Sequence, residues 1–223
     1  MSAIGPQITG PFELSIGQLR LAEIPSAVRI HQAAFDSFFL TFLGADFLEL
    51  LYHFYTTGRT EVALAGELGG RIIGTVIGTT QPLGFYARLA KYHFVPFAYA
   101  CVRPLIQRPR IFPRLVRALL YRGDAPRFSA SGALLASICV DPAFQGRGLG
   151  RKLLAAFESE MWKRRAEFVY LITDRENNHA TVSFYERLGW TVESEFLNPE
   201  RRALRRYWKM APPVKPLFDS GQI

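Results

Sequence analysis

The fold is decided by residues 134–161, which read LLASICVDPAFQGRGLGRKLLAAFESEM. The run from Leu134 to Val140, which is apolar except for Ser137, predicts a strand. A helix is predicted from about Gly148 to Arg165, since apolar residues recur at helical spacing at Leu149, Leu153, Phe157 and Met161. A glycine-rich loop therefore joins the end of a strand to the start of a helix.

The loop Gln145-Gly146-Arg147-Gly148-Leu149-Gly150 has the chemistry of an anion site. Glycines allow backbone N–H groups to turn inward and approach an anion closely, and a helix N-terminus adds partial positive charge. Two nucleotide-binding alternatives fail on a required residue. A dinucleotide fingerprint needs glycine at position 151, which is Arg151, and a triphosphate loop needs Ser or Thr after Lys152, where Leu153 stands.

With these residues the sequence resembles the GNAT superfamily of acyl-CoA N-acyltransferases, in particular its bacterial members. The resemblance covers residues 135–142, the loop and its helix, Asn178, and the segment from Phe184 to Trp190. It implies an α/β (mixed α+β) fold: a central, twisted, mostly antiparallel sheet whose motif strands splay apart. It also implies transfer of an acetyl group from acetyl-CoA to a primary amine by direct attack in a ternary complex, without a metal.

The resemblance also implies which residues contact acetyl-CoA. The pantetheine arm would pair with the backbone of Ile138, Cys139 and Val140, and the pyrophosphate would lie on the loop. The full set of implied cofactor contacts is Ile138, Cys139, Val140, Gln145, Gly146, Arg147, Gly148, Leu149, Gly150, Arg151, Asn178 and Tyr185.

Tyr185 matches the family position that returns a proton to the thiolate of CoA. Because a tyrosine keeps its proton at neutral pH and a thiolate can accept one, the assignment is chemically sensible. The other interpretation is a core aromatic at helical spacing with Val182 and Leu188. Asn178 either caps the helix that follows it or contacts the pantetheine. Cys139 is interpreted as a small buried residue, because direct transfer needs no cysteine nucleophile.

The general base is not identified by the sequence. An amine must lose a proton before it can attack, so a base or a water chain is required. Each candidate is better explained as a solvated or structural residue, and Asp141 as a turn former before Pro142. The candidates are Glu61, Glu67, His93, Asp141, Glu193 and Glu195.

The rest of the chain is predicted as further strands and helices of the same domain, residues 1–223. In front of the motif we expect a short strand at Leu19–Ala22, a helix after Pro25, a helix from about Ala45 to Tyr55 and a hairpin turning at Gly69-Gly70. Its two strands are Glu61–Glu67 and Arg71–Gly78. Behind it we expect a strand at Phe168–Thr173, a helix at Asn178–Leu188, strands near Trp190–Phe196 and Leu204–Met210, and a tail at 211–223.

Charge singles out residues 81–131 as a basic helical insertion. This segment has nine bases and one acid, and the remaining 18 bases and 18 acids cancel. From Pro113 to Arg122 a helix is predicted with Leu115, Val116, Leu119 and Leu120 on one face and Arg114, Arg117 and Arg122 on the other. Three uses stay open: packing on the domain, binding of an anionic acceptor such as a nucleotide-linked amino sugar, and peripheral contact with an acidic membrane.

Composition excludes several classes of protein. No apolar stretch approaches the roughly 20 residues of a membrane span, and residues 1–6 do not resemble a secretory signal. Two cysteines make no disulfide framework and no metal-ligand spacing with the four histidines, so a cytoplasmic protein without a metal is expected. Nucleic acid is not expected as a partner, because the bases are confined to one segment without a recognition motif. The oligomeric state is left open, a homodimer included.

Three functions follow from the sequence. The leading hypothesis is an N-acetyltransferase of a small-molecule amine. The alternatives are a protein or peptide N-acetyltransferase, with an open groove for its acceptor, and an acyl-CoA-binding sensor without transfer activity. An intact loop and the presence of Tyr185 argue against the sensor.

Overall fold

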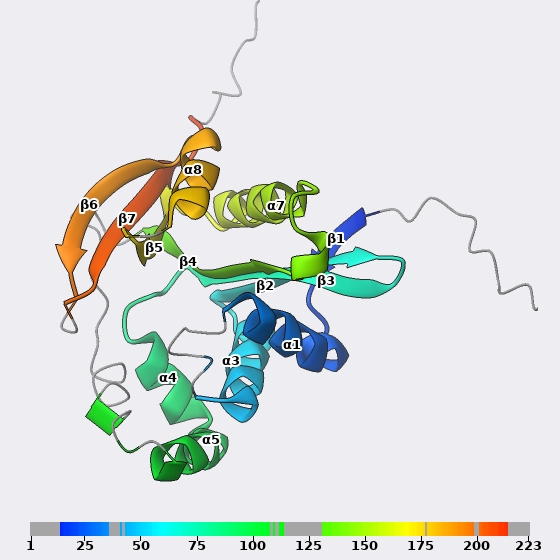
Figure 1. The fold of residues 1–223 in the computed structure, drawn as a ribbon, viewed down its shortest axis with the longest axis vertical. Coiled ribbons are helices and arrows are strands. Elements are labelled where there is room, and N and C mark those ends of the chain that lie inside the picture. The colour runs from blue at the N-terminus through cyan, green and yellow to red at the C-terminus, as the bar shows by residue number, and fades with distance from the viewer. Residues whose placement is uncertain are drawn as a thin grey trace, which may run out of the picture.

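The computed structural model describes residues 14–35, 41, 43–107, 109, 112–113, 131–176, 178–198 and 201–213. A seven-stranded sheet runs through the molecule in the order β1-β2-β3-β4-β5-β7-β6 (Figure 1). Its strands are β1 (Leu14–Gln18), β2 (Glu61–Leu68), β3 (Arg71–Thr79), β4 (Gly132–Val140), β5 (Phe168–Asp174), β6 (Thr191–Leu197) and β7 (Ala203–Met210). All neighbouring pairs are antiparallel except β4 and β5. The expected mixed, mostly antiparallel sheet is confirmed.

Helices cover both faces of the sheet (Figure 1). One face carries α1 (Ile24–Ala34), α3 (Ala45–Thr57), α4 (Phe85–Tyr92) and α5 (Phe94–Gln107), and the other carries α7 (Leu149–Lys163) and α8 (His179–Arg187). Short 3-10 helices lie at η1 (Leu21–Glu23) and η3 (Pro142–Phe144). None of the helices in the described ranges is long and apolar enough to cross a membrane.

The sheet separates two hydrophobic cores, one on each face, and β2 contributes side chains to both. Ala63 and Ala65 point into the core formed with α1 and α3, and Val62 and Leu64 point into the core formed with α7. Successive strand residues face opposite sides, so a strand covered on both sides must be apolar throughout. The apolar run at 62–65 is therefore a consequence of its central place in the sheet.

Glycines in β2 and β3 bring α7 close to the sheet. A Cβ on Gly66 would lie 2.8 Å from Leu149, one on Gly74 would lie 3.0 Å from both Leu149 and Leu153, and one on Gly78 would lie 2.5 Å from Phe157. The apolar stripe predicted for this helix is buried, with Leu149, Leu153, Phe157 and Met161 at most 2% exposed. The sheet thereby sets the position of the helix whose first turn follows the glycine loop.

The order of elements agrees with the sequence prediction, with one error at the front. The strand expected at Leu19–Ala22 is wrong: the chain forms β1 at Leu14–Gln18 and then the 3-10 helix η1. Edge strand β1 pairs with β2 on one side only, so its polar residues Ser15 and Gln18 are tolerated and hide the pattern. The helix predicted at Pro113–Arg122, apart from Pro113, and most of the tail at 211–223 lie outside the described residues.

Candidate active site

The loop after β4 is held in shape by its own residues. Asp141 Oδ1 accepts a hydrogen bond from the Ala143 N–H at 3.0 Å, and Gln145 Nε2 donates to the Val140 carbonyl at 3.3 Å. The turn-forming role expected for Asp141 is confirmed. Gly146 and Gly148 have φ angles of 75° and 79°, a left-handed conformation that disfavours residues with a Cβ. Glycine at these two positions is required by the path of the backbone.

This path leaves a row of backbone donors without acceptors. In the described part of the chain, nothing accepts the six N–H groups of residues 146–151, and the first N–H bonded within the turn is that of Lys152, to the Gly148 carbonyl. Unpaired donors at a helix N-terminus favour an anion, and the exposed bases Arg151 and Lys152 add positive charge. The Arg147 guanidinium lies 5.4 Å from the centre of the Phe144 ring, which keeps it beside the loop.

Strands β4 and β5 separate beside this loop. Their parallel pairing has only three residue pairs and ends at Leu134 and Tyr170, although the strands continue to Val140 and Asp174. On its other side β4 stays paired with β3 as far as Val140, with Ala136 bulged out between Ser137 and Leu135. The backbone of Leu135 to Val140 therefore has an open edge toward β5. The expected splay is confirmed, and an open edge is where an extended ligand adds as a strand.

The three β4 residues expected to contact the cofactor point to different faces. Ile138 and Val140 pack in the core on the α7 side, and Cys139 packs in the core on the α1 side. Cys139 is buried, as expected, and burial raises the pKa of its thiol. Its backbone still borders the open edge, but its sulfur does not.

Helix α8 brings Tyr185 beside the same region. The neighbouring Phe184 ring lies 3.6 Å from where a Cβ on Gly150 would be, so α8 packs against the first turn of α7. Tyr185 is 4% exposed, contacts the rings of Trp190 and Tyr207, and shares a core cluster with Val182 and Leu188. Its hydroxyl has no hydrogen-bond partner among the described residues, and burial raises its pKa. The hydroxyl therefore keeps its proton at neutral pH.

Asn178 does not cap α8 with its side chain. Its Nδ2 donates to Thr173 Oγ1 at 2.7 Å and to the Asp174 carbonyl at 3.1 Å, both at the end of β5. The capping interpretation is wrong, because the amide is used to join the start of α8 to the strand. Asn178 thus stabilises the end of β5, where this strand has separated from β4.

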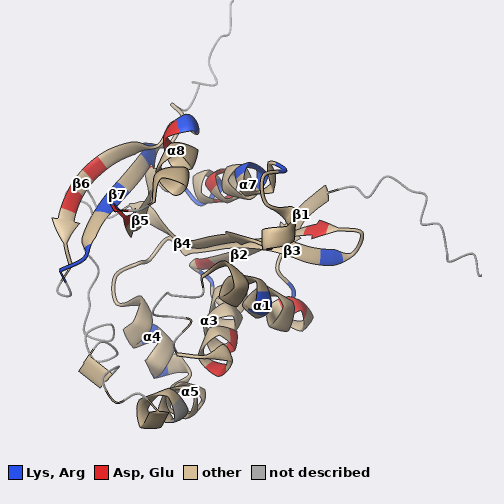
Figure 2. Cartoon of the chain, in the orientation of Figure 1, with Lys and Arg blue, Asp and Glu red and all other residues tan. Residues whose placement is uncertain are grey.

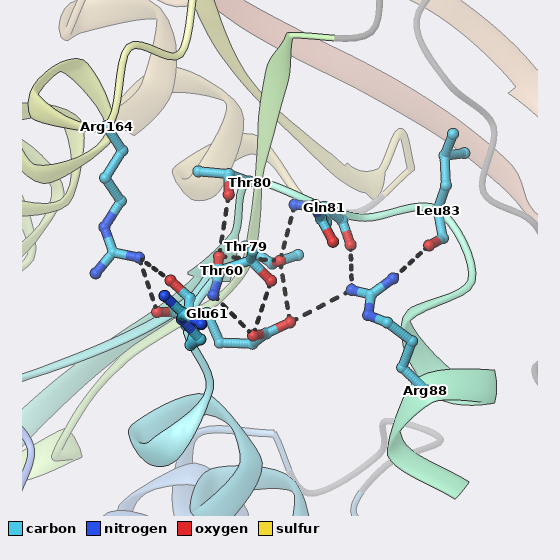
Figure 3. Close-up of polar contacts among 9 residues, drawn as sticks. Thr60, Glu61, Thr79, Thr80, Gln81, Leu83, Arg88 and Arg164 are labelled. Carbon is cyan, nitrogen blue, oxygen red and sulfur yellow. Dashed lines mark hydrogen bonds and ion pairs between the residues drawn. The ribbon is translucent and has the colours of Figure 1, made fainter. Parts of the chain in front are cut away.

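Glu61, the most buried of the candidate bases, belongs to a structural network (Figure 3). Its carboxylate accepts hydrogen bonds from Thr60 N (3.1 Å), Thr60 Oγ1 (2.9 Å) and Thr79 Oγ1 (3.4 Å) and forms an ion pair with Arg88 Nη2 at 3.3 Å. Arg88 also donates to the carbonyls of Gln81 and Leu83. This network ties the start of β2 to α4, and Figure 3 shows Arg164 bonding the Glu61 carbonyl from the other side.

Four other candidate bases are also held by arginines. Glu67 pairs with Arg20, Asp141 with Arg71, Glu193 with Arg206, and Glu195 with Arg175 and Arg205. His93 instead makes ring contacts with His53 and Phe54. Each of the five carboxylates is therefore paired with an arginine, and none of them lies beside the loop as an unpaired base.

A row of buried, hydrogen-bonded side chains lies on the α1 side of β4, and the sequence did not predict it. His31 Nδ1 and Thr75 Oγ1 each lie 3.1 Å from the Tyr52 hydroxyl, and Thr75 Oγ1 lies 3.1 Å from Cys139 Sγ. Burial lowers the pKa of His31 to about 4. These residues come from α1, α3, β3 and β4, so no local pattern marks them. The polar residues His31 and Tyr52 within apolar helical faces were the only available signal.

Comparisons with known proteins agree with this geometry. A family model described as the acetyltransferase (GNAT) family matches residues 27–190. A comparison with curated proteins finds no match. Solved structures with a similar fold include the ribosomal-protein-S18-alanine N-acetyltransferase from Escherichia coli, with 17% identity, a TM-score of 0.57, and coverage of 92% of this chain and 99% of that one.

Two further structures have comparable similarity. PaiA N-acetyltransferase from Thermoplasma acidophilum, solved with coenzyme A, has 12% identity and a TM-score of 0.54 over 87% of this chain and 98% of that one. Mutant forms of the spermidine/spermine N-acetyltransferase SpeG from Vibrio cholerae have 16% identity and a TM-score of 0.53 over 89% of this chain and 95% of that one. The chain belongs to the GNAT family of acetyltransferases, and its activity is acetyl-CoA-dependent N-acetylation.

Proposed function

We propose that this enzyme acetylates the primary amine of a small molecule by direct attack in a ternary complex. Binding of acetyl-CoA is supported by one observation: the six N–H groups of residues 146–151 are unpaired and lie next to the open edge of β4. A pyrophosphate needs clustered donors, and the amides of a pantetheine arm need an unpaired strand edge. Both features of acetyl-CoA therefore fit groups that otherwise lack partners.

Acetyl-CoA, when bound, supplies the activated acetyl group, and residues of the chain orient it. Residues 146–151 hold the phosphates, the backbone of Ile138 to Val140 pairs with the arm, and Asn178 stabilises the facing end of β5. An N–H of β4 is available to polarise the thioester carbonyl. Tyr185 carries the proton on its hydroxyl at neutral pH, because burial raises its pKa, and it donates this proton to the thiolate as it leaves; the tyrosinate then recovers a proton from water.

The amine proton leaves by another route. The five carboxylates considered as bases are held by arginines, which favours proton release through water over any one of them. We infer an anionic, sugar-like or nucleotide-linked acceptor from the surplus of bases in residues 81–131. Solved structures of similar fold are named for an alanine of ribosomal protein S18 and for spermidine/spermine, so the fold alone does not select the acceptor.

The deciding experiment measures thiol release from acetyl-CoA with a panel of amines, each offered with and without a phosphate group. We expect acceptor-dependent thiol with small amines and lower KM for the phosphorylated ones. Charge reversal of Arg114, Arg117 and Arg122 should raise the KM of the acceptor and leave that of acetyl-CoA unchanged. Tight CoA binding without acceptor-dependent thiol would instead identify a sensor, and activity confined to peptides would identify a protein acetyltransferase.

The loop is tested by a matched pair of glycine variants. Gly146→Ala and Gly70→Ala place a Cβ at nearly the same φ, 75° and 76°, and both Cβ positions are open. Each variant should lose a similar amount of stability, about 1–2 kcal/mol, because alanine disfavours the left-handed conformation. Only Gly146→Ala should raise the KM of acetyl-CoA, by about 10-fold, since each 1.4 kcal/mol of lost binding is tenfold. Equal KM values in the two variants would remove the loop from the phosphate site.

A further inference from the structure

Helix α5 has large apolar residues both on its buried side and on its exposed side. Phe97, Ala100 and Cys101 are buried in the core shared with α1 and α3. The opposite side carries five large apolar residues in solvent, which we call the α5 outer face: Phe94 (70% exposed), Val95 (74%), Tyr99 (75%), Val102 (50%) and Ile106 (76%). Among the α5 residues whose side chains the structure describes, none is charged, unlike those of α4 and α7 (Figure 2), and the sequence of the helix contains one base, Arg103.

An exposed face of this kind has a physical cost. A surface helix normally has one apolar stripe, and a helix that is apolar all round is normally covered on both sides. Single exposed apolar residues need no explanation, but a contiguous group on one helix marks an interaction site. The group continues into α4 through Tyr92, which is 66% exposed and whose ring lies 6.0 Å from the ammonium of Lys91.

Charge indicates what covers this face. From Gln81 to Gln107 the sequence has no Asp or Glu, and the whole segment to residue 131 has nine bases against one acid. Lys91 lies beside the Tyr92 ring, and an excess of bases in a segment that also carries large apolar and tyrosine side chains is typical of a helix lying in a lipid interface. Helix α3 packs against α5 and carries the exposed acids Asp46 and Glu49. The excess of positive charge therefore does not extend over α3.

We propose that the α5 outer face docks this enzyme on the surface of an anionic lipid bilayer. At 14 residues α5 is shorter than the roughly 20 residues that cross the hydrocarbon core, so it lies along the interface with Phe94, Tyr99 and Ile106 among the acyl chains. The basic segment provides attraction to the lipid phosphates. The proposal depends on surface chemistry alone and stands independently of the acceptor.

Vesicle co-sedimentation of the full-length protein tests this docking. Vesicles of phosphatidylcholine alone are compared with vesicles containing about one quarter phosphatidylglycerol. We expect at least about 10-fold tighter binding to the anionic vesicles, falling with salt, because the attraction is electrostatic. The variant Val95→Glu/Tyr99→Glu/Ile106→Glu should reduce this binding at least about 10-fold. All three side chains are at least 74% exposed, so the fold should tolerate the change.

A matched control adds the same three negative charges to remote exposed apolar residues. The variant Val192→Glu/Leu197→Glu/Met210→Glu lies on β6 and β7, at residues that are 43%, 67% and 56% exposed, and should bind anionic vesicles as the wild type does. Tyr99→Trp should also show a blue-shifted fluorescence on anionic vesicles, and Leu197→Trp should not. Far-UV circular dichroism and Tm serve as the check on folding and should match the wild type in all variants.

Three results would overturn the proposal. The first is absence of wild-type binding to anionic vesicles, and the second is equal binding by the triple variant, which would mean that charge alone is responsible. The third is a dimer by light scattering that the triple variant dissociates while vesicle binding is absent. That result would assign the α5 outer face to a second copy of the chain.

Discussion

Replacement of Glu61 distinguishes a structural carboxylate from a catalytic base. Its side chain is 3% exposed and that of its partner Arg88 is 25% exposed. Glu61→Ala removes the acceptor of four hydrogen bonds and leaves the Arg88 guanidinium and the Thr60 N–H without it. Breaking a fully buried ion pair costs about 3–5 kcal/mol, and a partner that is one-quarter hydrated reduces this to about 2–3 kcal/mol.

Both stability and activity are measured on the same preparations. For a chain of this size, 1 kcal/mol corresponds to about 2–4 °C in Tm, so Glu61→Ala should lower Tm by about 4–12 °C. Glu61→Gln keeps an acceptor oxygen and should cost roughly half as much. Reversible urea unfolding of Glu61→Ala, Arg88→Ala and the double variant should give a coupling free energy of about 1–2 kcal/mol.

The kinetic readout separates the two roles. A structural Glu61 predicts that kcat in both Glu61 variants stays within about 3-fold of the wild type at a temperature where they are folded, because a general base contributes about 100-fold or more. Glu195→Ala is the control for an exposed carboxylate held by arginines and should leave Tm almost unchanged. If the Glu61 variants instead turned over about 100-fold more slowly with an unchanged Tm, the structural role would be refuted and Glu61 would be the base.

Three further predictions concern the site and the two cores. Tyr185→Phe should lower kcat by about 100-fold and leave the KM of acetyl-CoA within about 2-fold, because only the donated proton is lost; an unchanged kcat would remove Tyr185 from the acid role. Burial lowers the pKa of His31 to about 4, below the unfolded value of about 6.5, so the unfolded chain binds the extra proton between these values. Unfolding free energy should therefore fall by up to about 3 kcal/mol as pH drops from about 6.5 to about 4, and His31→Gln should flatten this slope in urea titrations. Gly78→Ala would place a Cβ 2.3 Å from the Leu134 carbonyl and 2.5 Å from Phe157, so a loss of about 2–4 kcal/mol is expected, whereas an unchanged Tm would show that α7 is not seated on this glycine.

The elements around the loop could be predicted because their signals are local. An apolar strand, two glycines that need left-handed φ and an apolar stripe at helical spacing all lie within residues 134–161, and each constrains its own backbone. Strand β1 was misplaced because an edge strand needs no continuous apolar pattern. The burial of Cys139 was also predicted, and that of Tyr185 was the alternative interpretation, since apolar context along one helix or strand indicates its buried face.

Candidate bases could not be sorted from the sequence, because ion pairs join residues that are far apart along the chain. Glu61 meets Arg88 across 27 positions, and Arg206 meets Glu193 only because β7 folds back on β6. The polar chain of His31, Tyr52, Thr75 and Cys139 likewise assembles from four elements. Each of these four residues lies in a sequence context that is common for its helix or strand, so the local sequence does not indicate its partner.

The sequence by itself determined the glycine loop between a strand and a helix, the order of strands and helices, and the positive charge of residues 81–131, because these depend on neighbouring residues and composition. Only the tertiary structure decided where β4 leaves β5, which donors at residues 146–151 lack partners, which carboxylates are held by arginines, and which face of α5 remains in solvent. These properties depend on what each backbone edge and side chain meets in space. Local periodicity does not specify those partners, so the surroundings of the loop and the exposed face of α5 are defined only when the sheet and its two helical layers are assembled.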